Sequence, residues 1–341
     1  MKVLLLAGGE SSERDVSMAS GESVYKALKR LGHDVLVMDP LSGRSMLEAE
    51  PLFISHVKTG ETGPIPTRSI TMSLTDVLHR PDFPNIECVF IALHGGAGEN
   101  GSIQALLQLA GVPFIGSKMT ASAVAMDKAI SKRLFQSVGI KTPEYRLYRL
   151  QDEFVPYGVV REIAETMPLP LIVKPNDSGS TVGLTKVDNV EDLHPAIVTA
   201  AEESRNILIE EYIKGREMTV AVLNGKPLPV VEIIPKSGLY DYEAKYTKGM
   251  TSYMAPAEID SEIAERLQDA ACKAYEVIGA TGLARVDFIL QENRDFYCLE
   301  LNTLPGMTDL SLAPMAARAA GIEFDRLIQM LLDAAVGKKE D

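Results

Sequence analysis

Apolar runs alternate with amphipathic stretches along the first third of the chain. KVLLLAG at 2–8, VLVMD at 35–39 and ECVFIAL at 87–93 are typical of buried strands. Before Gly32, apolar residues recur at helical spacing, at Val24, Ala27, Leu28 and Leu31. Another helix is expected around SIQALLQLA, at 102–110. Strands that alternate with helices predict a parallel α/β domain.

A second pattern follows a helix-rich stretch at 120–138, which Gly139 ends. Strands are expected in the apolar segments PLIVKP, ILIEEYI and EMTVAVL, with a Gly/Ser loop at 176–183 and one more strand after that loop. Two later helices are predicted at 263–278 and 324–336. The first of them has five apolar positions at helical spacing: Ile263, Leu267, Ala270, Ala274 and Val277.

Domain boundaries are expected near residues 117 and 211, which divides the chain into 1–117, 118–211 and 212–341. A chain of 341 residues is long enough for two or three compact domains. Residues 41–84 are rich in Pro, Ser and Thr and show weak periodicity, so no element is assigned to them.

Charge and cysteine content exclude several classes of protein. Lys plus Arg number 34 against 47 Asp plus Glu, and the net charge of −13 argues against a nucleic-acid surface while allowing a small anionic substrate. Cys88, Cys272 and Cys298 are widely spaced and odd in number, which favours a reducing cytoplasm over a disulfide framework. No apolar run approaches the length of a membrane span, and the apolar start is too short for a signal peptide.

Two segments near the C-terminus predict a β-hairpin whose polar face carries chemistry. ARVDFIL at 284–290 and FYCLELN at 296–302 both alternate with period two. Only one register places apolar residues opposite each other, and it pairs Val286 with Leu301 and Phe288 with Leu299. The same register sets Asp287 opposite Glu300 and Arg285 opposite Asn302.

An Asp, a Glu and an Asn on one face offer hard oxygen ligands that suit Mg²⁺ on phosphate oxygens. Arg285 beside them can stabilise charge that develops during transfer. A solvated strand face with one salt bridge explains the pairing equally well. The Pro-Gly turn in NTLPGMT, residues 302–308, favours the metal-phosphate interpretation because such a turn can direct backbone N–H groups at an oxyanion.

Eight motifs in one order resemble the D-alanine–D-alanine ligase family of the ATP-grasp superfamily. They span nearly the whole chain and read GGESSERDVSMASG, HGGAGENG, AMDKAISK, LIVKPNDSGSTVG, LIEEYIKGREMTV, YDYEAKY, ARVDF and LELNTLPGMTDLSLAPMAA. The resemblance implies an N-terminal parallel α/β domain followed by a two-part ATP-grasp fold that holds ATP between two antiparallel sheets.

The resemblance also implies which residues bind ATP and metal. The residues that match ATP-binding positions are Lys128, Lys174, Ser180, Glu210, Glu211, Ile213, Glu217 and Lys245. The matches to ligands of two Mg²⁺ ions, which Mn²⁺ could replace, are Asp287, Glu300 and Asn302.

The predicted catalytic and amino-acid-binding residues come from several motifs. Glu13 is expected to orient the ammonium of the first D-alanine, and Ser180 and Tyr246 to link with it across the closed site. The resemblance places His94 near the first substrate, and Ser311 at the carboxylate of the second. Arg285 and the Gly306 N–H are expected at the reacting centre.

The implied activity is ATP-dependent ligation of two D-alanine molecules by a cytoplasmic homodimer, without nucleic-acid or membrane partners. An alternative is a ligase that makes D-alanyl-D-lactate or joins another carboxylate, although Tyr246 favours an amine as second substrate. A nucleotide-binding regulator without turnover is a further alternative. A nicotinamide dehydrogenase is disfavoured because GGESSERD lacks the G-x-G-x-x-G spacing.

Overall fold

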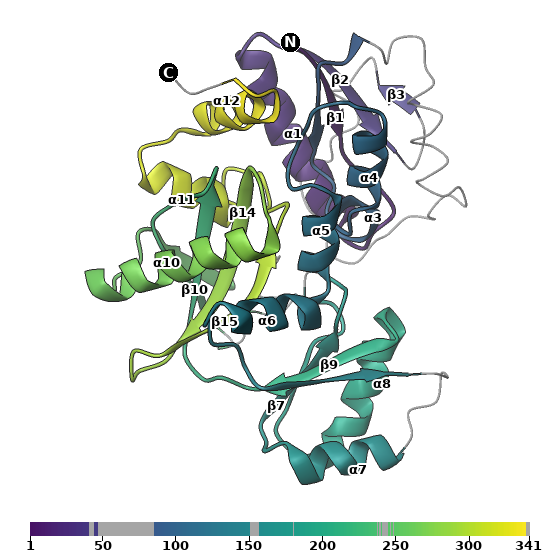
Figure 1. Cartoon of the computed structure of the whole chain (residues 1–341), viewed down its shortest axis with the longest axis vertical. Helices are drawn as coiled ribbons and strands as arrows, with labels where there is room; N and C mark the ends of the chain where they lie inside the picture. Colours follow the sequence, from purple (N-terminus) through teal and green to yellow (C-terminus); the bar gives the residue numbers. More distant parts are fainter. Residues whose placement is uncertain are drawn as a thin grey trace.

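The chain folds around three β-sheets that follow one another along the sequence (Figure 1). The computed structural model describes residues 1–40, 44–46, 85–150, 157–179, 181–236, 238, 240, 245, 247 and 249–338. Among these residues, none of the helices has the length and apolar character that a membrane span requires. Most of 41–84, to which the sequence assigns no element, lies outside the described residues.

The N-terminal sheet has the order β3-β2-β1-β4-β5 and is parallel except for β3 at its edge. Its strands are β1 (Lys2–Leu6), β2 (Asp34–Asp39), β3 (Arg44–Met46), β4 (Cys88–Ile91) and β5 (Phe114–Ile115). Its helices are α1 (Arg14–Arg30), α3 (Gly96–Glu99) and α4 (Ser102–Leu109).

Both faces of this sheet are buried, as the uninterrupted apolar strands predict. Val3 and Leu5 of β1 pack with Leu28 of α1, whereas Leu4 and Leu6 pack with α4 on the opposite face. The expected strands and helices of this part are confirmed, whereas the short strands β3 and β5 and the short helix α3 are not among the expected elements.

The central sheet is antiparallel and has the order β6-β9-β7-β8. Its strands are β6 (Tyr145–Arg149), β7 (Leu171–Pro175), β8 (Thr185–Val187) and β9 (Asn206–Glu211), and the helices beside it are α7 (Tyr157–Thr166), η2 (Val190–Asp192) and α8 (Leu193–Glu203). These helices and strands enclose a core of their own, with Ile163 at its centre. Strand β6 and the helices α7, η2 and α8 are not among the elements expected from the sequence.

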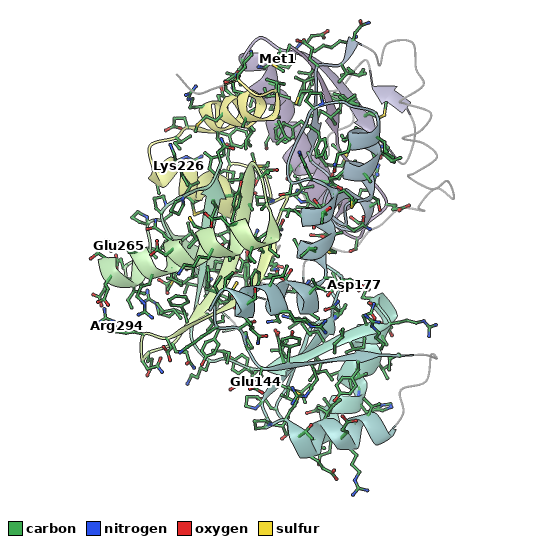
Figure 2. The ribbon with its side chains drawn as sticks, viewed as in Figure 1. Met1, Glu144, Asp177, Lys226, Glu265 and Arg294 are labelled. Carbon is green, nitrogen blue, oxygen red and sulfur yellow. The ribbon has the colours of Figure 1, made fainter. Side chains whose placement is uncertain are left out.

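The third sheet is antiparallel, with the order β13-β12-β10-β14-β15 and β11 paired to β10. Its strands are β10 (Arg216–Leu223), β11 (Lys226–Pro227), β12 (Val231–Pro235), β13 (Thr251–Met254), β14 (Leu283–Leu290) and β15 (Phe296–Asn302). Glu265 of α10 (Ser261–Ile278) and Arg294 of the β14–β15 turn mark the outer edge of this part (Figure 2).

Helices cover both faces of the third sheet. One face packs against α5 (Met119–Met126), α6 (Lys128–Ser137) and α10 (Ser261–Ile278). The other packs against α11 (Leu312–Ala319) and α12 (Phe324–Ala335), which also contact the N-terminal sheet. The predicted helices at 263–278 and 324–336 are confirmed. The domain limits at 117 and 211 stay a prediction.

The β14–β15 hairpin has the predicted register from Arg285 to Asp287 and a bulge directly after Asp287. Asp287 pairs with Glu300, and two further predicted pairs, Val286–Leu301 and Arg285–Asn302, are also present. The predicted Phe288–Leu299 pair is wrong, because the register shifts after Asp287 and Phe288 pairs with Cys298. The extra residue lets Cys298 enter the core and turns Leu299 toward a cavity.

Candidate active site

A cavity of about 320 Å³ lies between the central sheet and the third sheet. Strands β7 and β9 line one side of it, and β10, β12, β14 and β15 line the other. Apolar side chains such as Ile172, Met218 and Leu299 alternate in its wall with lysines and carboxylates. An apolar cleft with a few charged groups suits a flat heterocycle that carries a charged tail.

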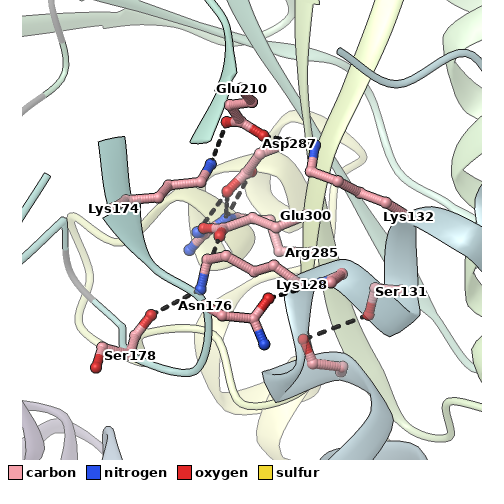
Figure 3. A network of polar contacts seen from close by, with 12 residues as sticks. Lys128, Ser131, Lys132, Lys174, Asn176, Ser178, Glu210, Arg285, Asp287 and Glu300 are labelled. Atoms are coloured by element: carbon pink, nitrogen blue, oxygen red, sulfur yellow. Dashed lines mark hydrogen bonds and ion pairs between the residues drawn. The ribbon is translucent and has the colours of Figure 1, made fainter. Parts of the chain in front are cut away.

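Two buried lysines, one on α6 and one on β7, line this cavity. Lys128 is the first residue of α6, and Lys174 lies in β7; each is 7% exposed. The Lys128 Nζ donates to the Ser178 carbonyl oxygen (2.6 Å) and lies 3.5 Å from Glu300 Oε2. Both are among the lysines predicted to bind phosphate, and the structure brings them to one cavity (Figure 3).

The end of β7 also holds the start of α6 in place. Asn176 accepts the Ala129 N–H at its Oδ1 (2.9 Å) and the Lys128 N–H at its carbonyl oxygen (3.1 Å). Asp127 caps the same helix by accepting the Ile130 N–H (3.0 Å). The loop that follows Lys174 therefore fixes the position of Lys128 as well.

A third lysine, Lys132, was not singled out in the sequence analysis. It lies one turn after Lys128 on α6, is fully buried, and reaches Glu210 Oε2 (2.9 Å) and Thr142 Oγ1 (2.8 Å). Glu210 Oε1 forms a second ion pair with Lys174. The only signal in the sequence is the four-residue spacing of the lysines in AMDKAISK, which puts both on one helix face.

The paired lysines set the charge state of Glu210. Burial alone would raise the pKa of this carboxyl, but the charges of Lys132 and Lys174 outweigh burial and hold the pKa below its ordinary value. Burial lowers the pKa of Lys132. Two lysines against one carboxylate leave a net positive charge behind the cavity wall, which favours an anionic ligand.

Asp287 and Arg285 form a tight pair on β14. The Arg285 Nη2 donates to Asp287 Oδ2 (2.7 Å) and its Nε donates to Oδ1 (2.9 Å), while Thr219 donates its hydroxyl to Oδ1 (2.6 Å). Burial would lower the pKa of Arg285, but the neighbouring carboxylate outweighs burial and raises it. The guanidinium therefore stays charged beside the cavity.

Glu300 faces the same cavity from β15. Burial alone would raise its pKa, but surrounding cations outweigh burial and lower the pKa to about 2. Those cations are Lys128, Lys174, Lys245 and Arg285. Lys245 lines the cavity too, and burial lowers its pKa.

The donor set for metal consists of oxygen atoms only. Asp287 and Glu300 are opposite each other in the hairpin, and Asn302 lies two residues after Glu300, in the Arg285–Asn302 pair. The Asn302 Oδ1 accepts the Leu304 N–H (2.8 Å) and keeps a second lone pair. In the described part of the chain, no three His, Cys, Asp or Glu side chains gather as metal ligands. Two carboxylates and one amide fit Mg²⁺ that shares its coordination with phosphate oxygens.

Four of the residues predicted to bind ATP line the cavity together: Glu210, Glu211, Ile213 and Glu217. Glu211 and Ile213 lie at and just beyond the end of β9, and Glu217 lies near the start of β10. Glu217 Oε1 accepts the Tyr240 N–H (3.3 Å), and burial raises the pKa of this carboxyl to about 7. Glu210 differs from the other three residues because its carboxylate is engaged by two lysines.

Glu13 lies immediately before α1, between two glycine loops. A Cβ placed on Gly95 would lie 2.7 Å from Glu13 Oε2, and one on Gly179 would lie 2.6 Å away. Both backbones therefore approach the carboxylate more closely than any side chain would allow. Gly179 belongs to the predicted Gly/Ser loop and also lines the cavity, so Glu13 adjoins both.

His94 is buried at the end of β4, in contact with two elements. Its Nε2 lies 3.0 Å from the Ser20 Oγ of α1, and its Nδ1 lies 3.4 Å from Glu99 Oε1. The Ser20 Oγ in turn accepts the Met307 N–H (3.2 Å). His94 is thereby connected with the loop that follows β15.

Gly306 and Ser311 lie close together in that loop. A Cβ on Gly306 would be 2.9 Å from the Ser311 Oγ, and the Thr308 N–H donates to the same oxygen (3.0 Å). The structure thus places Gly306, predicted at the reacting centre, beside Ser311, predicted at the second substrate. Ser180 and Tyr246, also predicted for the site, lie outside the described residues.

Two family models together match most of the chain. The model described as D-ala D-ala ligase N-terminus matches residues 2–117, and the model described as D-ala D-ala ligase C-terminus matches residues 134–333. The second match includes both strands of the hairpin and both sheets around the cavity.

Full-length relatives and solved structures agree with the family models. D-alanine--D-alanine ligases of Gloeobacter violaceus and Nitrosomonas europaea are 41% and 40% identical, over 98% and 97% of this chain and 100% and 96% of theirs. The Bacillus anthracis D-alanine--D-alanine ligase complexed with ATP has a TM-score of 0.76 at 28% identity, covering 99% of this chain and 98% of that one. The VanG D-Ala:D-Ser ligase of Enterococcus faecalis has a TM-score of 0.77 at 28% identity, covering 98% and 99%.

Proposed function

This chain belongs to the D-alanine–D-alanine ligase family, and we propose that it joins two D-alanine molecules at the expense of ATP. The products are D-alanyl-D-alanine, ADP and phosphate, and the dipeptide serves peptidoglycan synthesis. The observation that carries this proposal is the cavity between two antiparallel sheets, where Lys128 and Lys174 face Asp287 and Glu300.

In the first step, a carboxylate oxygen of one D-alanine attacks the γ-phosphorus of ATP and ADP leaves, which yields an acylphosphate. Such a transfer needs positioning and charge neutralisation more than a covalent protein group. Lys128, Lys174 and Lys245 supply positive charge along the cavity. Glu13 holds the ammonium of this D-alanine, which its place between the Gly95 and Gly179 backbones supports. His94, the residue before Gly95, lies near the same substrate.

In the second step, the amine of another D-alanine attacks the acyl carbon, loses a proton, and expels phosphate. The tetrahedral intermediate carries an oxyanion that Arg285 and the Gly306 N–H stabilise. Ser311 binds the carboxylate of the second D-alanine, and its Oγ lies beside Gly306. Ser180 and Tyr246 complete the link with Glu13 across the site.

Asp287, Glu300 and Asn302 would hold two Mg²⁺ ions, or Mn²⁺, against the phosphates. When bound, these ions neutralise charge on the phosphate oxygens. The support for this assignment is the all-oxygen donor set on one face of the hairpin. A homodimer in the cytoplasm is part of the same proposal and rests on the family resemblance; light scattering would show the mass of two chains.

Turnover tests the choice of second substrate. We expect phosphate release from ATP with D-alanine alone at neutral pH, and D-alanyl-D-alanine as product. The fold alone leaves this choice open, since the D-Ala:D-Ser ligase is as similar in structure as the D-alanine ligase. Activity that requires added D-lactate or D-serine would overturn the proposed second substrate. ATP binding without turnover on any of these would indicate a regulator.

Glu300→Ala tests the metal assignment. We expect loss of turnover by at least about a hundredfold, because one of two carboxylate ligands is removed. Asp295→Asn is the control. Asp295 immediately precedes the same strand, but it pairs with the exposed Lys141. Turnover and its dependence on Mg²⁺ concentration are the measurements. A Glu300→Ala enzyme with wild-type rate and Mg²⁺ dependence would exclude Glu300 as a ligand.

A further inference from the structure

Ser20 joins two parts of the site that lie far apart in the sequence. Ser20 lies in α1, three residues after Ser17, and is fully buried. Its Oγ lies between His94 Nε2 (3.0 Å) and the Met307 N–H (3.2 Å). His94 lies in the loop that follows β4 of the N-terminal sheet, whereas Met307 follows Gly306 in the loop after β15. One hydroxyl thus contacts both substrate-binding regions.

The hydrogen bonds of Ser20 fix where the protons lie. Met307 can only donate through its N–H, so the Ser20 Oγ accepts there. His94 Nε2 is the other polar atom that the described residues place within reach of the Ser20 Oγ. A neutral His94 that accepts the Ser20 hydroxyl hydrogen at Nε2 carries its own proton at Nδ1, which lies 3.4 Å from Glu99 Oε1.

Among the described residues, the Ser20 Oγ is the acceptor of the Met307 N–H. This N–H is a buried backbone donor in the loop whose neighbouring N–H, at Gly306, is assigned to the oxyanion. A loop released from Ser20 would move the Gly306 donor relative to the acyl carbon. Displacements of this kind affect rate because oxyanion stabilisation depends on the donor position.

We propose that Ser20 is a positioning residue that fixes the Gly306 loop for the second step of the reaction. It acts through Met307 and holds His94 as the Nδ1–H tautomer, and it touches neither substrate. This proposal rests on the proposed ligase function and adds a residue that couples the first-substrate domain to the second-substrate loop.

Ser17 provides a matched control on the same helix. It is also fully buried, but its Oγ accepts the Gly8 N–H (2.8 Å) and donates to the Ala92 carbonyl (2.7 Å). All these groups belong to the N-terminal domain. Ser17→Ala and Ser20→Ala therefore remove the same atom at the same depth, and only Ser20→Ala breaks the connection to the Gly306 loop.

The experiment separates the two chemical steps in each variant. Positional isotope exchange in γ-phosphate-labelled ATP reports acylphosphate formation, and dipeptide formation reports the second step. We expect Ser20→Ala to lower the ratio of dipeptide formation to exchange by about 10- to 100-fold. Ser17→Ala should leave that ratio at the wild-type value even if it lowers stability.

Ser20→Cys keeps the side-chain size but weakens both hydrogen bonds, so it tests the proposal if Ser20→Ala fails to fold. We expect a smaller loss of the same ratio. An unchanged ratio in Ser20→Cys, or equal ratios in Ser20→Ala and Ser17→Ala, would overturn the proposal. Nitrogen NMR of His94 that shows the Nε2–H tautomer would overturn the proton assignment. A wild-type enzyme with neither exchange nor dipeptide would instead refute the ligase function.

Discussion

Lys132 is a charged side chain that is fully buried behind the wall of the cavity. Its contacts with Glu210 and Thr142 offset the desolvation of its ammonium group. Because Lys132 neutralises Glu210, the charge of Lys174 remains available to a nucleotide. A residue without access to the ligand can in this way set the electrostatics of the ligand site.

Lys132→Met should raise the KM for ATP by roughly tenfold, because Lys174 and Glu210 then form a neutral pair. The KM for D-alanine should stay the same. Loss of one partner of a buried ion pair should also lower the free energy of unfolding by about 3–5 kcal/mol. Steady-state kinetics and urea unfolding are the measurements.

Lys141→Met is the control for this prediction, since Lys141 pairs with Asp295 at an exposed position. It should cost less than about 1 kcal/mol and leave both KM values unchanged. If Lys132→Met lowers stability but keeps the wild-type KM for ATP, Lys132 has a purely structural role.

The β14–β15 hairpin shows at the scale of an element what a sequence can specify. Period-two alternation predicts the pairs at Asp287 and Val286, since a slip would bury carboxylates. The bulge after Asp287 escapes this logic, because Leu299 has no partner in the strand register and lines the cavity instead. Contacts of Lys132 with Glu210, or of Ser20 with Met307, depend equally on distant segments.

Strands and helices with few apolar residues or weak periodicity could not be predicted from the sequence either. Strand β6 alternates between half-buried and exposed residues, so its sequence has no apolar run to reveal it. By contrast, the motif residues Lys128, Lys174, Asp287 and Glu300 are found around one cavity. Their residue types and order were readable from the sequence, whereas the ion pairs that set their charges were not.

Leu299→Ala should weaken ATP binding without much loss of stability, because Leu299 lines the cavity and is only partly buried. Removal of its apolar contact with a nucleotide should cost about 1 kcal/mol, which is roughly a fivefold rise in the KM for ATP. Its free energy of unfolding should change by less than about 1 kcal/mol. Kinetics at varied ATP and urea unfolding are the measurements.

Leu301→Ala is the matched control on the same strand. Leu301 is 3% exposed and belongs to the core with Val286, so its truncation should cost about 2–5 kcal/mol. Its KM for ATP should not change. If the two variants show the same effects on stability and KM, Leu299 is a core residue and the bulge has no role at the cavity.

At the scale of the whole molecule, the two ends of the chain share one core. Val3 and Leu5 of β1 lie in the same cluster as Ala221 of β10 and Leu327 of α12. Figure 1 shows α12 beside α1, and Arg30 of α1 forms an ion pair with Asp325 of α12 (2.6 Å). The central sheet has a separate core around Ile163. The N-terminal and C-terminal parts should therefore act as one body, to which the central part is joined.

Leu327→Ala tests this division, because Leu327 is fully buried in the shared core. The truncation should cost about 2–5 kcal/mol and should speed amide hydrogen exchange in β1 and β10 together. Exchange in β7 and β9 should change much less. Ile163→Ala, at an equally buried position of the central core, should produce the reverse pattern. Faster exchange in β10 with an unchanged β1 after Leu327→Ala would mean that the two ends unfold independently, and that closure of the site involves three moving parts rather than two.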